Sequence, residues 1–175
     1  MSNNPYKPPE SDPTGARTPD VPGSPLRAIL TGLVIDLGGS AVLGIVLTSV
    51  YALTLSGQDM TDAQIDAALQ HIPAASAFGV LGIVLGALMS VLGGFVCARV
   101  VLRNEYRVGA AMAGISVLLG VMLGGDGDLD DLGVLLILCT AACNMLGVKY
   151  GAEYNRRLEA LATPPAAPPA DTPTP

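Results

Sequence analysis

Aromatic, histidine and charged residues are scarce in this sequence, and each shortage argues against a class of protein. Its 175 residues include no Trp, two Phe and a single His, and only 14% are charged. Soluble domains carry about 25% charged residues, so a soluble fold is not expected. Catalysis by a side-chain nucleophile needs an adjacent base, and neither His nor Glu occurs in the long apolar runs. Cofactor and nucleic-acid motifs are also lacking, so we expect no enzyme, no cofactor and no nucleic-acid partner.

The cysteines are few and all lie in apolar segments. Cys97, Cys139 and Cys143 form an odd set surrounded by hydrophobic residues, which is a poor basis for a disulfide framework. Three thiols could hold a soft metal ion such as Cu(I), but small apolar packing residues are the preferred interpretation. His71 has no second histidine, so we expect no metal site there either.

Long hydrophobic runs are what the sequence has in quantity. They cover residues 28–55, 74–102, 108–125 and 131–151. A helix of about 20 mainly apolar residues crosses the hydrocarbon core of a membrane, and about 17 suffice with little tilt. The runs therefore predict an all-α membrane protein, a four-transmembrane-helix bundle formed by one domain, residues 26–158. The 21 glycines favour close packing of these helices.

The positively charged residues predict the orientation of this bundle. Cytoplasmic loops of membrane proteins carry an excess of Lys and Arg. The loops after the first and third runs contain neither, so we expect these loops outside and both termini in the cytoplasm. All nine Lys and Arg lie near or beyond the opposite ends of the runs: Lys7, Arg17, Arg27, Arg99, Arg103, Arg107, Lys149, Arg156 and Arg157.

Both ends of the chain are rich in proline. Residues 1–25 and 159–175 cannot form a hydrophobic core, and we expect them to be disordered tails. The polar lead ahead of the first run predicts an uncleaved anchor rather than a cleavable signal peptide.

The first outer loop contains the signature of a short helix. Thr61 and Gln64 form a capping box, in which each side chain satisfies a free backbone N–H of the other. Apolar residues then follow at helical spacing, and Pro73 prevents continuation. We expect an amphipathic helix over Met60–Ile72 at the outer surface.

The second outer loop is acidic. Asp126, Asp128 and Asp130 are spaced as at the start of an EF-hand calcium loop, but Ile137 stands where the bidentate Glu belongs. A turn followed by a helix cap is the preferred interpretation, and a weak cation site is the alternative.

Small residues recur at every fourth position of each run and so share one face of each helix. Such faces let transmembrane helices approach closely, and we expect them to form the helix contacts of the bundle. The positions include Gly32, Ser40 and Gly44 in the first run, Gly82, Gly86, Ser90 and Gly94 in the second, Ser116, Gly120 and Gly124 in the third, and Cys139, Cys143, Gly147 and Gly151 in the fourth.

Asp36 lies on the small-residue face of the first run, about two turns inside its cytoplasmic end. A carboxylate in hydrocarbon costs about 2.5–3.5 kcal/mol even on insertion scales, so it should face the other helices and find a partner. Asn144 and Arg99 are the candidate partners in an intramembrane polar cluster. Two interpretations stay open: a polar clasp between helices, or a proton or cation site.

The end of the second run, Gly93–Arg99, reads Gly-Gly-Phe-Val-Cys-Ala-Arg. It resembles the Gly-Gly-aromatic-x-x-Ala/Gly-Arg signature of small four-span bacterial membrane proteins of unknown function. This resemblance implies a bacterial inner-membrane location and no particular activity. We expect a structural or partner-binding membrane component, in contact with lipid and with a second copy or another membrane protein. The alternative is a small transporter or channel subunit that uses Asp36.

Overall fold

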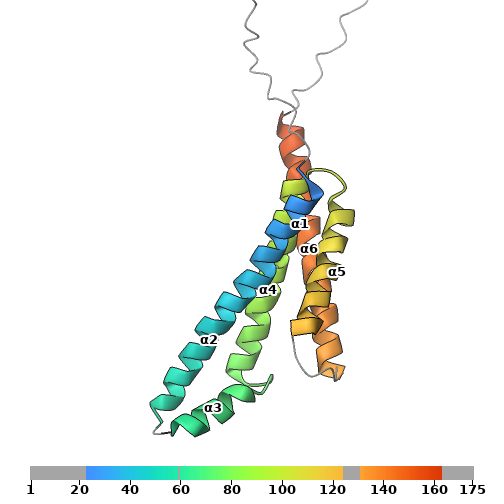
Figure 1. Ribbon diagram of the computed structural model, residues 1–175. Coiled ribbons are helices and arrows are strands. Elements are labelled where there is room, and N and C mark those ends of the chain that lie inside the picture. The colour runs from blue at the N-terminus through green and yellow to red at the C-terminus, as the bar shows by residue number, and fades with distance from the viewer. Residues whose placement is uncertain (1–22, 59, 124–130, 163–175) are drawn as a thin grey trace, which may run out of the picture.

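The computed structural model describes residues 23–58, 60–123 and 131–162. Four helices in this part of the chain are long and apolar enough to span a membrane (Figure 1). The predicted all-α class and the number of candidate spans are therefore confirmed. The predictions for the acidic loop 124–130, and for most of the two Pro-rich tails, lie outside the described residues.

The first span is a composite helix. It starts as α1 (Pro25–Leu33), passes through a π-helical segment, η1 (Val34–Gly38), and continues as α2 (Gly39–Ser56). Pro25 occupies the first helical turn, where the N–H that proline lacks would have no partner within the helix. A π turn contains an extra residue, so it rotates α2 relative to α1 about the helix axis.

A short helix, α3 (Asp62–Gln70), follows the first span. It begins at a capping box, with the backbone N–H of Thr61 donating to Oε1 of Gln64 at 3.0 Å. Ile65 of α3 and Leu55 of α2 are buried in the corner where these two helices meet. The helix is shorter at both ends than the sequence predicted.

The remaining spans are α4 (Ala77–Val101), α5 (Glu105–Leu123) and α6 (Asp131–Ala162). Helix α6 contains 32 residues and continues well past the predicted end of the fourth span at residue 151. Its last turn occupies residues 159–162, where we expected a disordered tail to begin.

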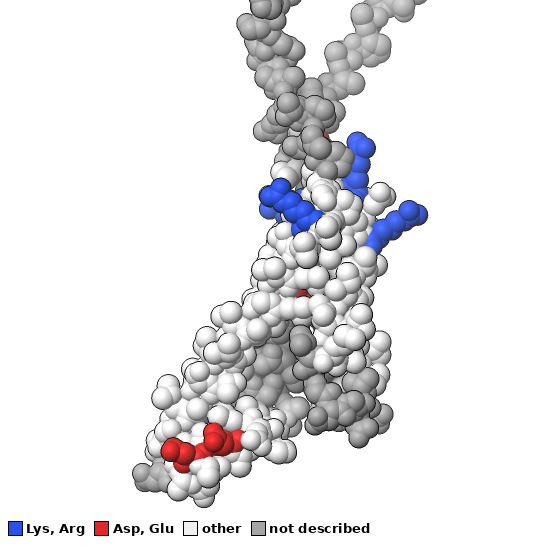
Figure 2. All heavy atoms as spheres, in the orientation of Figure 1, with Lys and Arg blue, Asp and Glu red and all other residues white. Residues whose placement is uncertain are grey.

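The Lys and Arg residues distinguish the two ends of the molecule. Lys and Arg gather where α1 begins and α4 ends, which we call the basic end (Figure 2). The opposite end carries α3 with Asp62 and Asp66, and we call it the α3 end.

The half of the bundle nearer the basic end is closely packed. Helix α4 contacts α6 so closely that a Cβ on Gly94 would collide with the carbonyl of Asn144, and one on Gly147 with the carbonyl of Val91. These positions match the expected small-residue contacts. The buried hydrophobic residues of this half are Ala28, Cys97, Ala98, Val101, Met112, Ala113, Val148 and Ala152.

The half nearer the α3 end is open, because α2 and α4 diverge there from α5 and α6 (Figure 1). Gly44 and Gly86 have no atom within 4 Å of where a Cβ would lie, and Gly82 meets only Leu47, at 3.4 Å. The expectation of close contacts at Gly44 and Gly86 was therefore wrong. Two physical causes are the divergence of the helices and the rotation that the π turn introduces after Gly32.

Candidate functional site: a buried carboxylate cluster

Asp36 is buried inside the bundle, with 2% of its surface exposed. It lies in η1, about 16 Å along the first span from Pro25. Single π turns within longer helices occur frequently at functional sites. Both the burial and the local geometry therefore distinguish Asp36 from the other acidic residues that the structure describes.

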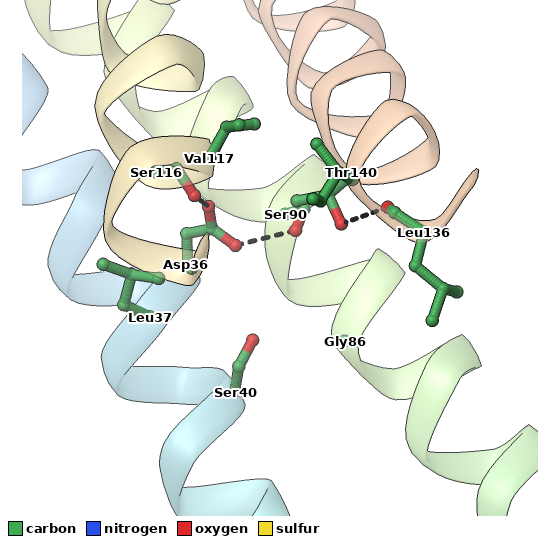
Figure 3. Close-up of a pocket in the computed structure, with 11 residues that line it drawn as sticks. Asp36, Leu37, Ser40, Gly86, Ser90, Ser116, Val117, Leu136 and Thr140 are labelled. Carbon is green, nitrogen blue, oxygen red and sulfur yellow. Dashed lines mark hydrogen bonds between the residues drawn. The ribbon is translucent and has the colours of Figure 1, made fainter. Parts of the chain in front are cut away.

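Three hydrogen-bond donors, one from each of the other spans, contact this carboxylate. The Ser90 hydroxyl of α4 donates to Oδ1 at 2.7 Å, and the Ser116 hydroxyl of α5 donates to Oδ2 at 2.6 Å (Figure 3). Nδ2 of Asn144 on α6 donates to Oδ2 at 3.2 Å. These four residues, which we call the carboxylate cluster, join all four spans at one point.

The partners of Asp36 are as buried as the carboxylate itself. Ser90 and Ser116 are each 3% exposed, and Asn144 is fully buried. Hydrogen bonds to a charged group contribute about 1.5–3 kcal/mol, more than those between neutral groups. A buried donor that loses its acceptor costs about 1–3 kcal/mol. The cluster therefore couples the position of the first span to the positions of the other three.

Of the two predicted partners, the structure brings Asn144 to Asp36 and places Arg99 elsewhere. Arg99 is exposed, and its guanidinium carbon lies 4.6 Å from the ring centroid of Tyr154 and 6.0 Å from that of Phe95. A cation over an aromatic face is attracted by the ring quadrupole. Near the end of α4, the long side chain reaches outward instead of entering the bundle. Including Arg99 in the cluster was therefore wrong.

Ser90 and Ser116 were expected only as small packing residues, and their role as hydrogen-bond donors was missed. Ser90 and Ser116 could have been identified from the sequence, because they lie at the same depth in the bundle as Asp36. Asp36, Ser90 and Ser116 each stand 11 positions from the basic-end terminus of their span, at Pro25, Val101 and Glu105 respectively.

A cavity of about 250 Å³ opens beside the carboxylate (Figure 3). Its lining residues lie on the side of the cluster that faces the α3 end. Gly86 and Gly120 make room for it, since neither has an atom of the described residues within 4 Å of where a Cβ would lie. The polar residues of the lining are Asp36, Ser40, Ser90, Ser116 and Thr140, and the larger apolar ones are Leu37, Val117, Leu136 and Ile137.

Toward the basic end the cavity is closed. Ala28, Cys97 and Met112 are fully buried on that side of the cluster, in contact with one another across α1, α4 and α5. Asp36 therefore sits at the boundary between a dry, packed half and an open half of the bundle.

The other residues considered for chemistry do not assemble. Cys97 is buried, Cys143 is half-buried and Cys139 is exposed. In residues 23–58, 60–123 and 131–162, no group of three or more His, Cys, Asp or Glu side chains is arranged to hold a metal ion. His71 is exposed at the end of α3.

Comparison with known proteins adds no relative: no family model matches the sequence, no curated protein matches it, and no solved structure matches the fold. The resemblance to small four-span bacterial membrane proteins stays a prediction.

Proposed function

We propose that this chain is a non-enzymatic, polytopic membrane component with a structural or partner-binding role. In this proposal both termini are cytoplasmic and the α3 end is outside, in a bacterial inner membrane. The gathering of Lys and Arg at the basic end supports the orientation. The sequence resemblance supports the choice of membrane.

The observation that carries the proposal is the convergence of four spans on one carboxylate. The first span contributes Asp36, and each of the other three spans contributes one polar side chain that donates a hydrogen bond to it. Such a cluster holds the spans in a single arrangement, because moving any one of them breaks a hydrogen bond between buried groups. A fixed arrangement suits a component that presents a surface to other membrane proteins.

A conducting role receives less support. A transport path needs polar groups on both sides of the central site, and the side toward the basic end is filled by Ala28, Cys97 and Met112. These residues would have to separate before an ion could pass Asp36. The geometry therefore favours a role in which the cluster stays closed.

The first span is the best candidate for contact with a partner. Only 11% of its most apolar window is buried within the chain, against 17–28% for the other spans. A second copy of this chain or another membrane protein would cover that face.

Purification from native membranes in a mild detergent tests this proposal. We expect a membrane protein, or a second copy, to co-purify in a constant ratio to the tagged chain, and a bulky substitution on the exposed face, Gly44→Leu, to reduce the ratio. The matched control is Ala160→Leu, because Ala160 is exposed near the end of α6. Gly109→Leu would not serve as a control, because the side chain of Val148 leaves no room for a larger residue at position 109. Recovery of the chain alone, as a monomer, would contradict the proposal.

A further inference from the structure

The charge of Asp36 is not balanced by a neighbouring side chain. Its three hydrogen-bond partners are neutral, and the cavity lining contains no Lys, Arg or His. Arg27, the preceding basic residue on the same span, is exposed and lies nine positions closer to the basic end. An isolated charge in a low-dielectric interior is costly unless an opposite charge is near. An ionised Asp36 therefore has no balancing positive charge among the side chains that line the cavity.

Three of the hydroxyl groups that line the cavity donate their hydrogens within the bundle. Those of Ser90 and Ser116 go to Asp36, and that of Thr140 goes to the backbone carbonyl of Leu136 at 2.9 Å (Figure 3). Each oxygen keeps lone pairs that can accept. Ser40 contributes another hydroxyl at the cavity wall. Walls with acceptors and a negative charge select a cation over an anion.

Asn144 of the carboxylate cluster also has an unsatisfied atom, although it is not one of the residues that line the cavity. Its Nδ2 donates to Asp36, but its Oδ1 is buried and has no hydrogen-bond partner among the described residues. A buried acceptor without a partner costs about 1–3 kcal/mol, so such atoms are rare in native proteins unless a water or an ion satisfies them. The cluster therefore leaves both a charge and an acceptor to be satisfied.

We propose that the cavity beside Asp36 binds one hydrated monovalent metal cation, with Na⁺ as the probe. One carboxylate balances one positive charge, whereas Ca²⁺ takes 6–8 oxygen ligands and commonly several carboxylates. A water molecule occupies about 30 Å³ in the liquid, so a cavity of about 250 Å³ has room for the ion and part of its hydration shell. The lining oxygens and water would share the coordination.

The ion would enter from the α3 end and would not cross the bundle. The cavity lies on that side of the cluster, and Ala28, Cys97 and Met112 close the other side. Binding therefore neutralises the carboxylate and stabilises the bundle by mass action. Na⁺ binding at this cavity needs no protein partner, so it can be measured on the purified chain.

Equilibrium binding of radiolabelled Na⁺ to the full-length protein in detergent tests the proposal, with ionic strength held constant by N-methylglucamine chloride. We expect one saturable site per chain. Asp36→Asn should abolish saturable binding. Ser40→Ala should weaken it by up to about tenfold, since a bond to a charged group contributes about 1.5–3 kcal/mol and water replaces part of it. Ser49→Ala, an exposed hydroxyl of α2 outside the cavity, is the matched control and should bind as the wild type does.

A second variant separates the cavity from the carboxylate. Gly120→Leu places a large side chain on the cavity wall, where a Cβ at residue 120 has no described atom within 4 Å, so we expect Na⁺ affinity to fall at least about tenfold while the unfolding temperature without Na⁺ is retained. If Asp36→Asn does not fold, Gly120→Leu and Ser40→Ala carry the test. Absence of saturable binding to the wild type, or wild-type affinity in Gly120→Leu, would overturn the proposal.

Discussion

Gly93 sets how closely the first span can approach α4 beside Asp36. A Cβ at this position would lie 2.8 Å from the carbonyl oxygen of Gly32 and 2.9 Å from Cβ of Asp36. Both atoms belong to the same face of the first span. The carboxylate can therefore reach its donors only because residue 93 has no side chain.

We predict that Gly93→Ala destabilises the protein, because the added methyl group pushes α1 and η1 away from α4. Overpacking of this kind typically costs about 1–3 kcal/mol, and the hydrogen bonds of Asp36 would lengthen as well. Gly44→Ala is the matched control, since no atom lies within 4 Å of its Cβ position. Thermal unfolding in a mild detergent should give a lower midpoint for Gly93→Ala and an unchanged or slightly higher one for Gly44→Ala. Equal midpoints for the two variants would contradict the packing described here.

Individual residues of the site were partly predictable from the sequence. A lone acidic residue in an apolar run must face other helices, which identified Asp36, and similar depth identified Asn144. Arg99 was misplaced because the end of a span offers it both an inward and an outward rotamer. The choice depends on the aromatic rings of Phe95 and Tyr154, which come together only in the fold.

At the scale of elements, η1 and α3 are the two departures from straight spans. The π turn of η1 was not predictable, because the residues of Val34–Gly38 are as compatible with an α-helix. Because the π turn rotates α2, Gly44 does not face a neighbouring helix as it would in an uninterrupted helix. The close contact expected at Gly44 was wrong for this reason. Helix α3, in contrast, was predictable, since its capping box is a local signal that needs no tertiary contact.

We predict that Thr61→Ala shortens or frays α3 from its N-terminal end. Loss of an N-cap typically costs about 0.5–2 kcal/mol, and a helix of nine residues has few other hydrogen bonds to keep it folded. Backbone chemical shifts in micelles should move toward random-coil values over Asp62–Gln70. Ser56→Ala, whose hydroxyl bonds only to the carbonyl of Ala52 within α2, is the control and should leave those shifts in place. Random-coil shifts for this segment in the wild type would refute the helix itself.

The whole molecule combines a closed half with an open half, and its Lys and Arg residues gather at the closed end. The buried hydrophobic residues of the bundle lie toward the basic end, and the cavity lies toward the α3 end. The sequence predicted the division of charge. It could not predict the open half, because small residues at every fourth position permit close packing without enforcing it.

The orientation in the membrane is testable by cysteine accessibility. In a background with Cys97, Cys139 and Cys143 replaced by Ala, we predict that a membrane-impermeant thiol reagent labels Gln58→Cys in intact cells. Arg103→Cys, in the turn between α4 and α5, should react only after the membrane is permeabilised. Labelling of Arg103→Cys in intact cells would reverse or refute the proposed topology.

The unfolding temperature of two Asp36 variants tests most directly whether one carboxylate holds the four spans together. Asp36→Asn keeps one side-chain oxygen that can accept a hydrogen bond, and its new amide NH₂ can donate to a serine hydroxyl that has rotated. Its unfolding midpoint should therefore stay within a few degrees of the wild type. Asp36→Leu removes all three hydrogen bonds and leaves Asn144 buried without a partner, at about 1–3 kcal/mol for each unsatisfied group. Its midpoint should fall by at least about 4 °C, since 1 kcal/mol corresponds to about 2–4 °C in a chain of this size. A midpoint for Asp36→Leu equal to or above that of the wild type would contradict the proposal that the Asp36 carboxylate holds the four spans together.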